Sequence, residues 1–272
     1  MWECERRAHQ LNKILMRGTS REQEIGCVSS DAYITSIGSQ PIIIVTHTYN
    51  ELLASLWSRV DWSRGKKIVI CDCSAEEAKH YAAWDLVPVV VNREHTRQYL
   101  KHSLDQSNLQ WKAWDTSVCF ASRQEQADFV WFFEGDVMFR PDKLSALLLS
   151  KSESNADLIG TGTWPRSDTW HWNRAGCNFA HDLRVGTIVS ICRLSRRLLH
   201  QVVTRAQQNK ACYLEKLFPS ICDFENWPKE SLVYGQDIHS KYSISKQDDK
   251  LCDDPELPLH ACKQLQISTV PK

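Results

Sequence analysis

Residues 130–139 read VWFFEGDVMF, an apolar run that is interrupted by two acids and one glycine. The run from residue 128 to residue 133 predicts a buried strand, and Glu134 and Asp136 follow at its carboxyl end. Two carboxylates two residues apart point the same way, and they repel unless a cation or a proton neutralises them. Mg²⁺ and Mn²⁺ prefer such oxygen ligands. The acids are therefore either a metal-binding pair or ordinary turn acids, and the apolar flanks favour the edge of a sheet over a free loop.

Similar apolar runs on either side of this stretch predict the fold class. Buried strands are predicted at residues 41–46, 67–71, 88–91, 128–133, 157–161 and 185–191. Helical spacing of apolar residues predicts helices at 50–60, 74–84, 108–125, 141–149 and 195–207. Strands that alternate with helices and are apolar throughout predict an α/β fold. We expect a mostly parallel central sheet with helices on both faces and a loop-rich C-terminal part.

Composition excludes several classes of protein. Lys and Arg number 33, as do Asp and Glu, so binding of nucleic acid through bulk charge is not expected. No apolar run reaches the length of about 18 residues that a membrane span needs. The charged start, MWECERRAHQ, does not resemble a signal peptide. The expected location is cytoplasmic, or the Golgi or secretory lumen if an N-terminal anchor has been lost.

The cysteines leave the redox compartment open. There are 11, so at least one is unpaired within the chain. Four lie in apolar stretches and are expected to be small core residues: Cys71, Cys73, Cys119 and Cys192. The pairs Cys212/Cys222 and Cys252/Cys262 lie in polar sequence and could form local disulfides, which would indicate a secretory lumen. Free thiols there would favour the cytosol. Zinc is not expected, because its closely spaced ligand pairs are missing.

The absence of several motifs limits the classes of ligand that the protein is expected to bind. The chain has no P-loop and no G-x-S-x-G motif, and Gly160-x-Gly162 lacks the rest of a dinucleotide fingerprint. In an open parallel sheet, ligands bind beyond the carboxyl ends of the strands. The polar residues expected there are His47, Tyr49, Asn50, Asp72, Asn92, Arg93, Glu134 and Asp136. Together these observations favour a nucleotide-type ligand that is held through a metal ion.

The order of elements resembles the GT-A fold of nucleotide-sugar-dependent glycosyltransferases over about residues 40–265. There the first strand ends at the nucleotide, the second ends in an acid as at Asp72, and a later one ends in a D-x-D-type motif that binds metal and diphosphate. The stretch from Trp111 to Asp115, followed by 129–137, is similar to one loosely characterised group of these enzymes. So are the Trp-rich segment and residues 193–199 and 214–219. Glu134 and Gly135 depart from D-x-D, so Asp136 is the preferred metal ligand and Glu134 the second.

The resemblance implies a single GT-A-like catalytic domain at 41–265, after an N-terminal helix and loop extension at 1–40. Residues 41–140 would be its nucleotide-binding half and 141–265 its acceptor-binding half. The implied activity moves a sugar from a nucleotide-sugar donor to a hydroxyl of a glycan or glycoconjugate. A divalent cation, Mn²⁺ or Mg²⁺, would assist, and the reaction would be inverting, although retention stays open.

The resemblance also implies roles for particular residues. The expected donor-binding residues are His47, Tyr49, Asn50, Asp72, Arg93, Lys112, Glu134, Asp136 and Lys263. The expected metal ligands are Asp136, Glu134 and His260, and the expected acceptor-binding residues are Trp164, Trp170 and Trp172. Glu215 is the expected general base, with Asp237 and Asp182 as rivals.

Each of these assignments has a simpler alternative. Glu215 could be a surface acid paired with Lys216 or Lys210, and Asp237 an exposed turn acid. The tryptophans could cover the core, His260 could be solvated, and Arg93 could lie on a solvated helix face. A metal-dependent nucleotidyltransferase should carry a glycine-rich loop after its first strand, and residues 46–50 contain no glycine. A non-catalytic sugar-binding module remains open, because the acid motif is altered.

Overall fold

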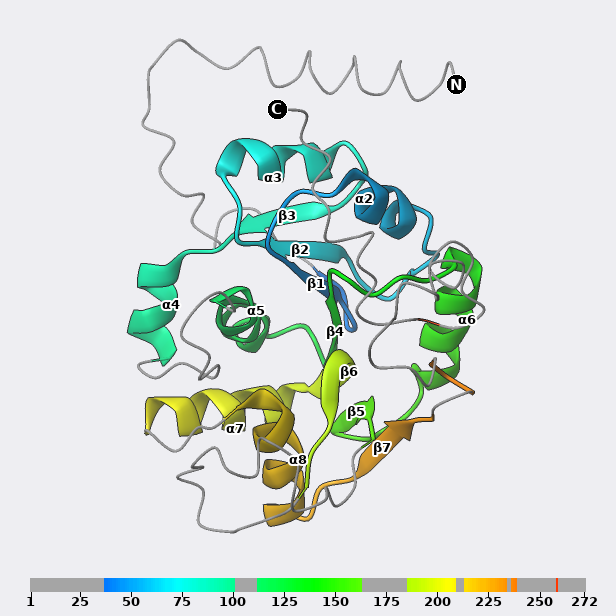
Figure 1. The fold of residues 1–272 in the computed structure, drawn as a ribbon. Helices are drawn as coiled ribbons and strands as arrows, with labels where there is room; N and C mark the ends of the chain where they lie inside the picture. Colours follow the sequence, from blue (N-terminus) through cyan, green and yellow to red (C-terminus); the bar gives the residue numbers. More distant parts are fainter. Residues whose placement is uncertain are drawn as a thin grey trace, which may run out of the picture. The chain divides into compact units, whose positions relative to one another are not determined.

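The computed structural model of the protein describes residues 37–100, 112–162, 185–208, 213–233, 236–238 and 258. Within these ranges, seven strands form one sheet: β1 (Ile42–Thr46), β2 (Lys67–Cys71), β3 (Val87–Val90), β4 (Phe129–Glu134), β5 (Leu158–Thr161), β6 (Ile188–Ser195) and β7 (Lys229–Leu232). The helices in this part of the chain are α2 (Glu51–Ser58), α3 (Ala75–Ala82), α4 (Arg93–Leu100), α5 (Lys112–Ser122), α6 (Pro141–Lys151), α7 (Arg196–Gln207) and α8 (Leu214–Phe224) (Figure 1).

The strand order is β3-β2-β1-β4-β6-β5-β7. Strands β3, β2, β1 and β4 are parallel, β6 is antiparallel to both β4 and β5, and β7 is parallel to β5. The carboxyl ends of six strands and the amino end of β6 therefore lie at one edge of the sheet, which we name the carboxyl edge. The predicted α/β fold with a mostly parallel sheet is confirmed.

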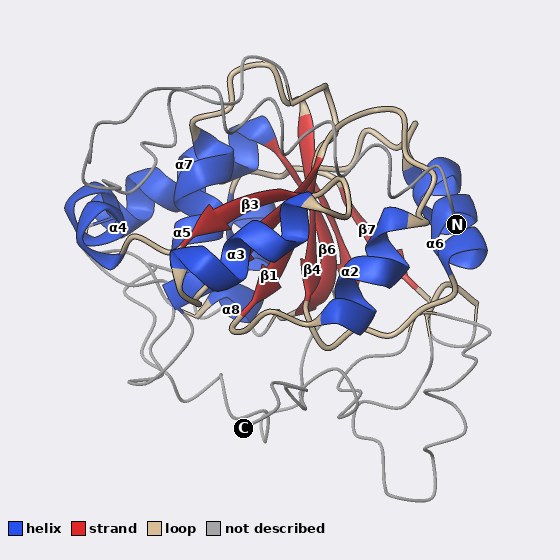
Figure 2. Cartoon of the chain, turned by 90° about the horizontal axis from the view of Figure 1, so that it is seen from above, coloured by secondary structure: helices blue, strands red, loops and turns tan. Residues whose placement is uncertain are grey.

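Strands β1, β2 and β4 are apolar over most of their length, because helices cover both faces of the sheet (Figure 2). Alternate residues such as Ile42, Ile44 and Phe133 pack in one core cluster with apolar residues of α2, α3 and α6. Helices α4, α5, α7 and α8 lie on the other side of the sheet (Figure 1). Strands β1, β2 and β4 thus bury side chains on both faces, whereas the edge strands β3 and β7 are mostly half-buried.

A buried arginine joins the antiparallel half of the sheet to the segment after α6. Arg193 of β6 is fully buried, and its guanidinium donates to the carbonyls of Lys151 (2.8 Å) and Ser154 (2.5 Å). It also lies over the ring of Phe129, 4.1 Å from the centroid. Burial lowers the pKa of Arg193 to about 10. The guanidinium therefore satisfies backbone acceptors that would otherwise be buried without partners.

The structure differs from the sequence-based expectation in the C-terminal part. Residues 214–232 were expected to be loop-rich, and they form helix α8 and strand β7. Pro219 lies inside α8, and an internal proline ordinarily argues against a helix. Strand β6 also begins at Ile188 and runs on to Ser195, later than the predicted range of 185–191. Among the described helices, none combines the length and the apolar character that crossing a membrane requires.

Candidate active site at the carboxyl edge

The register of the central strands brings the predicted site segments together. Val45 lies opposite Glu134, and Thr46 lies opposite Cys71. Two backbone bonds continue this pairing beyond the strands, from the Gly135 amide to the Val45 carbonyl (2.7 Å) and from the Asp72 amide to the Thr46 carbonyl (3.1 Å). The acid motif, the end of β1 and Asp72 are thus neighbours at the carboxyl edge.

Glu134 and Asp136 lie in a tight turn at this edge. The turn is closed by a hydrogen bond from the Val137 amide to the Glu134 carbonyl (3.1 Å). Both acids are half-buried, whereas residues 130–133 and 137–139 are buried. The expectation that the acids lie at a sheet edge between buried flanks is confirmed. Their carboxylates can bind a ligand that arrives at the edge, while the backbone around them is held in the core.

Trp114 of α5 holds the first acid. Its indole Nε1–H donates to Glu134 Oε1 (3.1 Å), and its ring stacks on Phe132 with the centroids 5.6 Å apart. The sequence contained Trp114 in the segment similar to known transferases, but the spacing gave no sign of this bond. The indole therefore orients the Glu134 carboxylate through one of its oxygens.

Gly135 is required by the close approach of β1. A Cβ at this position would lie 2.9 Å from both Cβ and Oγ1 of Thr46, and 3.1 Å from the carbonyl oxygen of Val45. Real Cβ atoms essentially never make contacts under 3.0 Å. The middle position of the motif therefore has no room for a side chain. Only the outer two positions, Glu134 and Asp136, can supply ligands.

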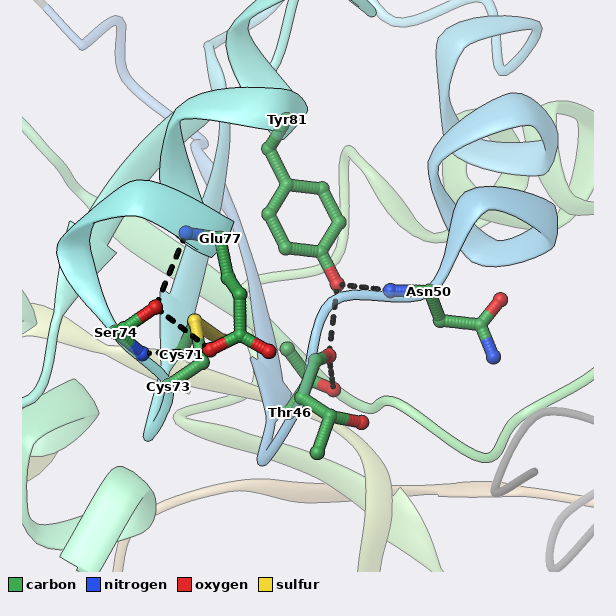
Figure 3. The surroundings of a disulfide bond; sticks show 8 residues. Thr46, Asn50, Cys71, Cys73, Ser74, Glu77 and Tyr81 are labelled. Carbon is green, nitrogen blue, oxygen red and sulfur yellow. Dashed lines mark hydrogen bonds between the residues drawn. A yellow bond between two sulfur atoms is a disulfide. The ribbon is translucent and has the colours of Figure 1, made fainter. Parts of the chain in front are cut away.

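The loop between β1 and α2 is built around a buried tyrosine of α3 (Figure 3). The Tyr81 hydroxyl accepts from the Asn50 amide (3.2 Å) and donates to the Thr48 carbonyl (3.1 Å). Burial raises the pKa of Tyr81 to about 12, so this donor keeps its proton at neutral pH. The Asn50 side chain caps α2, and the Tyr49 hydroxyl accepts from the indole of Trp84 (3.3 Å). Asn50 and Tyr49, expected to bind the donor, therefore both help to shape the loop.

A disulfide brackets Asp72 at the end of β2. Cys71 and Cys73 are bonded to each other, with their Cα atoms 5.3 Å apart (Figure 3). The expectation of a core position is confirmed for Cys71, which is buried in the core. Cys73 is half-buried, and nothing in the sequence indicated its bond to Cys71. The carboxylate of Asp72 pairs with the guanidinium of Arg93 (2.7 Å). Two residues expected to bind the donor are thus in direct contact.

Glu215 lies in the first turn of α8 and is buried, at 6% exposed. Its backbone carbonyl accepts from the amide of Thr187 (2.8 Å), the residue that precedes β6 at the carboxyl edge. The adjacent Lys216 is also buried, at 4% exposed. The alternative of a surface acid is therefore wrong, and Glu215 and the acid turn lie at the same edge of the sheet.

Asp237 has partners that stabilise the chain after β7. Its Oδ2 accepts from the Val233 amide (2.8 Å) and lies 3.6 Å from Nζ of Lys151. Lys151 in turn pairs with Glu230 of β7 (2.9 Å). With 15% of its side chain exposed, Asp237 is not the exposed turn acid of the simpler alternative. These contacts fit a structural acid better than the rival base.

The remaining predictions fall on other parts of the chain. The residues outside the described ranges are Trp164, Trp170, Trp172, Asp182, His260, Lys263, Cys212, Cys252 and Cys262. Lys112 begins α5, but its side chain is not among those described. Cys119, Cys192 and Cys222 are buried free thiols, so the bridge from Cys222 to Cys212 that the sequence left open is not formed. Within the described ranges, no group of three or more His, Cys, Asp or Glu residues is placed to hold a metal ion.

Comparison with known proteins shows which solved structures share this fold. No protein-family model and no curated protein matches the sequence. The galactosyltransferase LgtC, solved in complex with donor and acceptor sugar analogs, is similar in structure with a TM-score of 0.52 and 8% identity. A second LgtC structure, that of an active-site mutant, gives a TM-score of 0.52 and 10% identity. Each alignment covers 86% of this chain and 98% of LgtC. At such identities the likeness concerns the fold, and this chain has the α/β architecture of the GT-A glycosyltransferases.

Proposed function

We propose that the protein is a glycosyltransferase that moves a sugar from a nucleotide-sugar donor to a hydroxyl of a glycan or glycoconjugate. The observation that carries the proposal is the half-buried turn of Glu134 and Asp136 at the carboxyl edge of a GT-A-like sheet. In open α/β sheets this edge is where ligands bind. The likeness to a galactosyltransferase supports the fold on which the proposal rests.

The residues of the turn fit a divalent cation that is shared with a nucleotide. Mg²⁺ is commonly bound by one or two carboxylates, with substrate phosphates and water completing its shell. Glu134 and Asp136 supply such a pair, and Trp114 orients the first of them. A bound cation would neutralise the charge that develops on the leaving nucleoside diphosphate. His260 as a third ligand and Lys263 as a phosphate contact belong to the same proposal.

We assign the nucleoside-binding and general-base roles from the positions of the residues along the carboxyl edge. Asp72, held between the bridged cysteines and paired with Arg93, would bind the nucleoside, since it follows the strand next to β1. Glu215 would accept the proton of the acceptor hydroxyl as that oxygen attacks the anomeric carbon, which would give inversion. Trp164, Trp170 and Trp172 would contact the acceptor through their ring faces.

The proposal is tested by the thermal midpoint of the protein with UDP, GDP, CDP and ADP, each with and without Mn²⁺. A ligand at about 100 times its dissociation constant stabilises the native state by about 2.7 kcal/mol. For a chain of this size that corresponds to a rise of about 5–10 °C. We expect such a rise with one nucleotide in the presence of Mn²⁺.

Two variants separate the acid turn from general charge effects. Asp136→Asn should abolish the Mn²⁺-dependent rise, whereas Asp142→Asn, at an exposed acid of α6 that pairs with Arg140, should keep it. If no nucleotide shifts the midpoint of the wild type, the nucleotide-sugar mechanism is wrong. Retained glycan binding without a nucleotide response would favour a non-catalytic sugar-binding module.

A further inference from the structure

Helix α8 contains a proline where a regular helix would need a backbone donor. Pro219 lies in the helix interior, four residues after Glu215. Proline has no N–H, and its ring presses against the carbonyl four residues earlier. The Glu215 carbonyl therefore has no helical donor four residues later. It accepts instead from the Thr187 amide, at 2.8 Å.

Thr187 is itself held firmly by strand β5. It is fully buried, and its hydroxyl donates to the carbonyl of Thr161 (3.2 Å). A Cβ on Gly160 of β5 would lie 2.3 Å from Thr187 Oγ1, so the residue before β6 packs against β5 with no room for a side chain at position 160. The Thr187 amide, which donates to the Glu215 carbonyl, is therefore held in one position against β5.

The contact also determines which end of α8 meets the carboxyl edge. Thr187 directly precedes β6, whose amino end lies at that edge beside the acid turn of β4. The far end of α8 lies near the opposite edge, where the pKa of Cys222 is raised by burial and by the nearby Asp157, which precedes β5. Glu215 is thus placed by its own backbone at the edge where the donor is proposed to bind.

We propose that Pro219 is a positioning residue for the transfer reaction. By removing one helical bond it frees the Glu215 carbonyl to dock on Thr187, and this docking holds the Glu215 carboxylate toward the attacking hydroxyl. The proposal rests on the proposed function, because it takes Glu215 as the general base. In this proposal Pro219 affects the rate of transfer through Glu215, without contacting the substrate itself.

The test is Pro219→Ala, which restores the missing N–H and relieves the ring contact. Helix propensity favours alanine, so the variant should fold with a thermal midpoint equal to or above that of the wild type. The restored donor competes for the Glu215 carbonyl, so the Thr187 amide should exchange hydrogen about tenfold faster. With the nucleotide-sugar that supports transfer among those carrying the base selected by the nucleotide screen, kcat should fall about 10- to 100-fold while KM for the donor stays unchanged.

Two further variants show whether the effect passes through Glu215. In a Glu215→Gln background, Pro219→Ala should lower kcat no further, because the group it positions is already removed. A merely structural role would lower kcat in both backgrounds. Pro141→Ala is the matched control, since Pro141 occupies the first turn of α6, where no N–H is needed, and it should alter neither Thr187 exchange nor kcat.

The outcomes distinguish this proposal from the proposed function. Unchanged Thr187 exchange in Pro219→Ala would overturn the mechanical link, whatever the activity. Faster exchange with unchanged kcat would overturn the positioning role and leave the transferase intact. A wild type that binds no nucleotide and transfers no sugar would overturn both the proposed function and the catalytic role, while exchange at Thr187 would still report the link itself.

Discussion

Gly135→Ala probes the close approach of β1 and β4 at the proposed metal site. The new methyl carbon would meet Thr46 Cβ and Oγ1 at 2.9 Å and the Val45 carbonyl at 3.1 Å. Neither Thr46 Cβ nor a backbone carbonyl can rotate away, so the acid turn or the end of β1 must move. Overpacking of this kind costs about 1–3 kcal/mol.

The assay is urea unfolding followed by tryptophan fluorescence. With a slope of about 3 kcal/mol per M, the midpoint should fall by about 0.3–1 M. Because the displaced turn carries Glu134 and Asp136, the Mn²⁺-dependent rise of the thermal midpoint with nucleotide should also shrink. Thr46→Gly removes both side-chain atoms of the clash, so the double variant should be less destabilised than the sum of the two single variants.

Two results would refute this reasoning. If Gly135→Ala leaves both the urea midpoint and the nucleotide response unchanged, the strands are not in the contact described. If the effects of Gly135→Ala and Thr46→Gly are strictly additive, the loss of stability does not come from Thr46.

Three further predictions follow from buried side chains. Arg193→Met leaves backbone carbonyls without a donor and should lower the free energy of unfolding by about 3–5 kcal/mol, whereas Arg59→Met, at the exposed residue that follows α2, should change it by under about 0.5 kcal/mol; equal urea midpoints would contradict this. Tyr81 keeps its proton up to about pH 12 in the native state, while an unfolded tyrosine ionises near pH 10. Stability from this group is therefore complete below pH 10 and is lost between pH 10 and pH 12, and Tyr81→Phe should show a shallower decline of the thermal midpoint there; parallel declines would speak against it. Trp114→Phe keeps the stacked ring but removes the donor to Glu134, so it should weaken the Mn²⁺-dependent nucleotide response several-fold with little loss of stability; an unchanged response would show that the indole bond does not matter.

Much of the fold was predictable because its signals are local. The strands predicted at 41–46, 67–71 and 128–133 are confirmed, within one residue at each end, as Ile42–Thr46, Lys67–Cys71 and Phe129–Glu134. A strand that is covered on both faces is mostly apolar, and the sequence shows that directly. The start of α3 was also correct, because Ser74 and Glu77 form a capping box within four consecutive residues. The sequence also predicted that Glu134 and Asp136 lie at a sheet edge, because apolar residues flank them on both sides. The structure shows that these flanking residues are buried.

The errors concern residues whose state depends on distant neighbours. Cys73 was expected in the core, and it bridges to Cys71 where β2 turns away from the sheet. Cys222 was a candidate for a bridge, and it is a free thiol whose pKa burial raises to about 12. Helix α8 was not predicted, because Pro219 reads locally as a break. The Glu215 carbonyl, which the proline leaves without a helical donor, accepts from Thr187 just before β6.

The sequence by itself determined the α/β class, the position of the acid pair and the strand ends that form the carboxyl edge, because hydrophobic period and turn residues act over a few positions. Only the tertiary structure decided what surrounds those residues. It set the indole of Trp114 against Glu134, excluded a side chain at position 135 through Thr46, and docked the Glu215 carbonyl on Thr187. These contacts join segments far apart in the chain. The distances between the atoms in these contacts depend on how strands and helices pack against each other. A local sequence pattern does not contain that information.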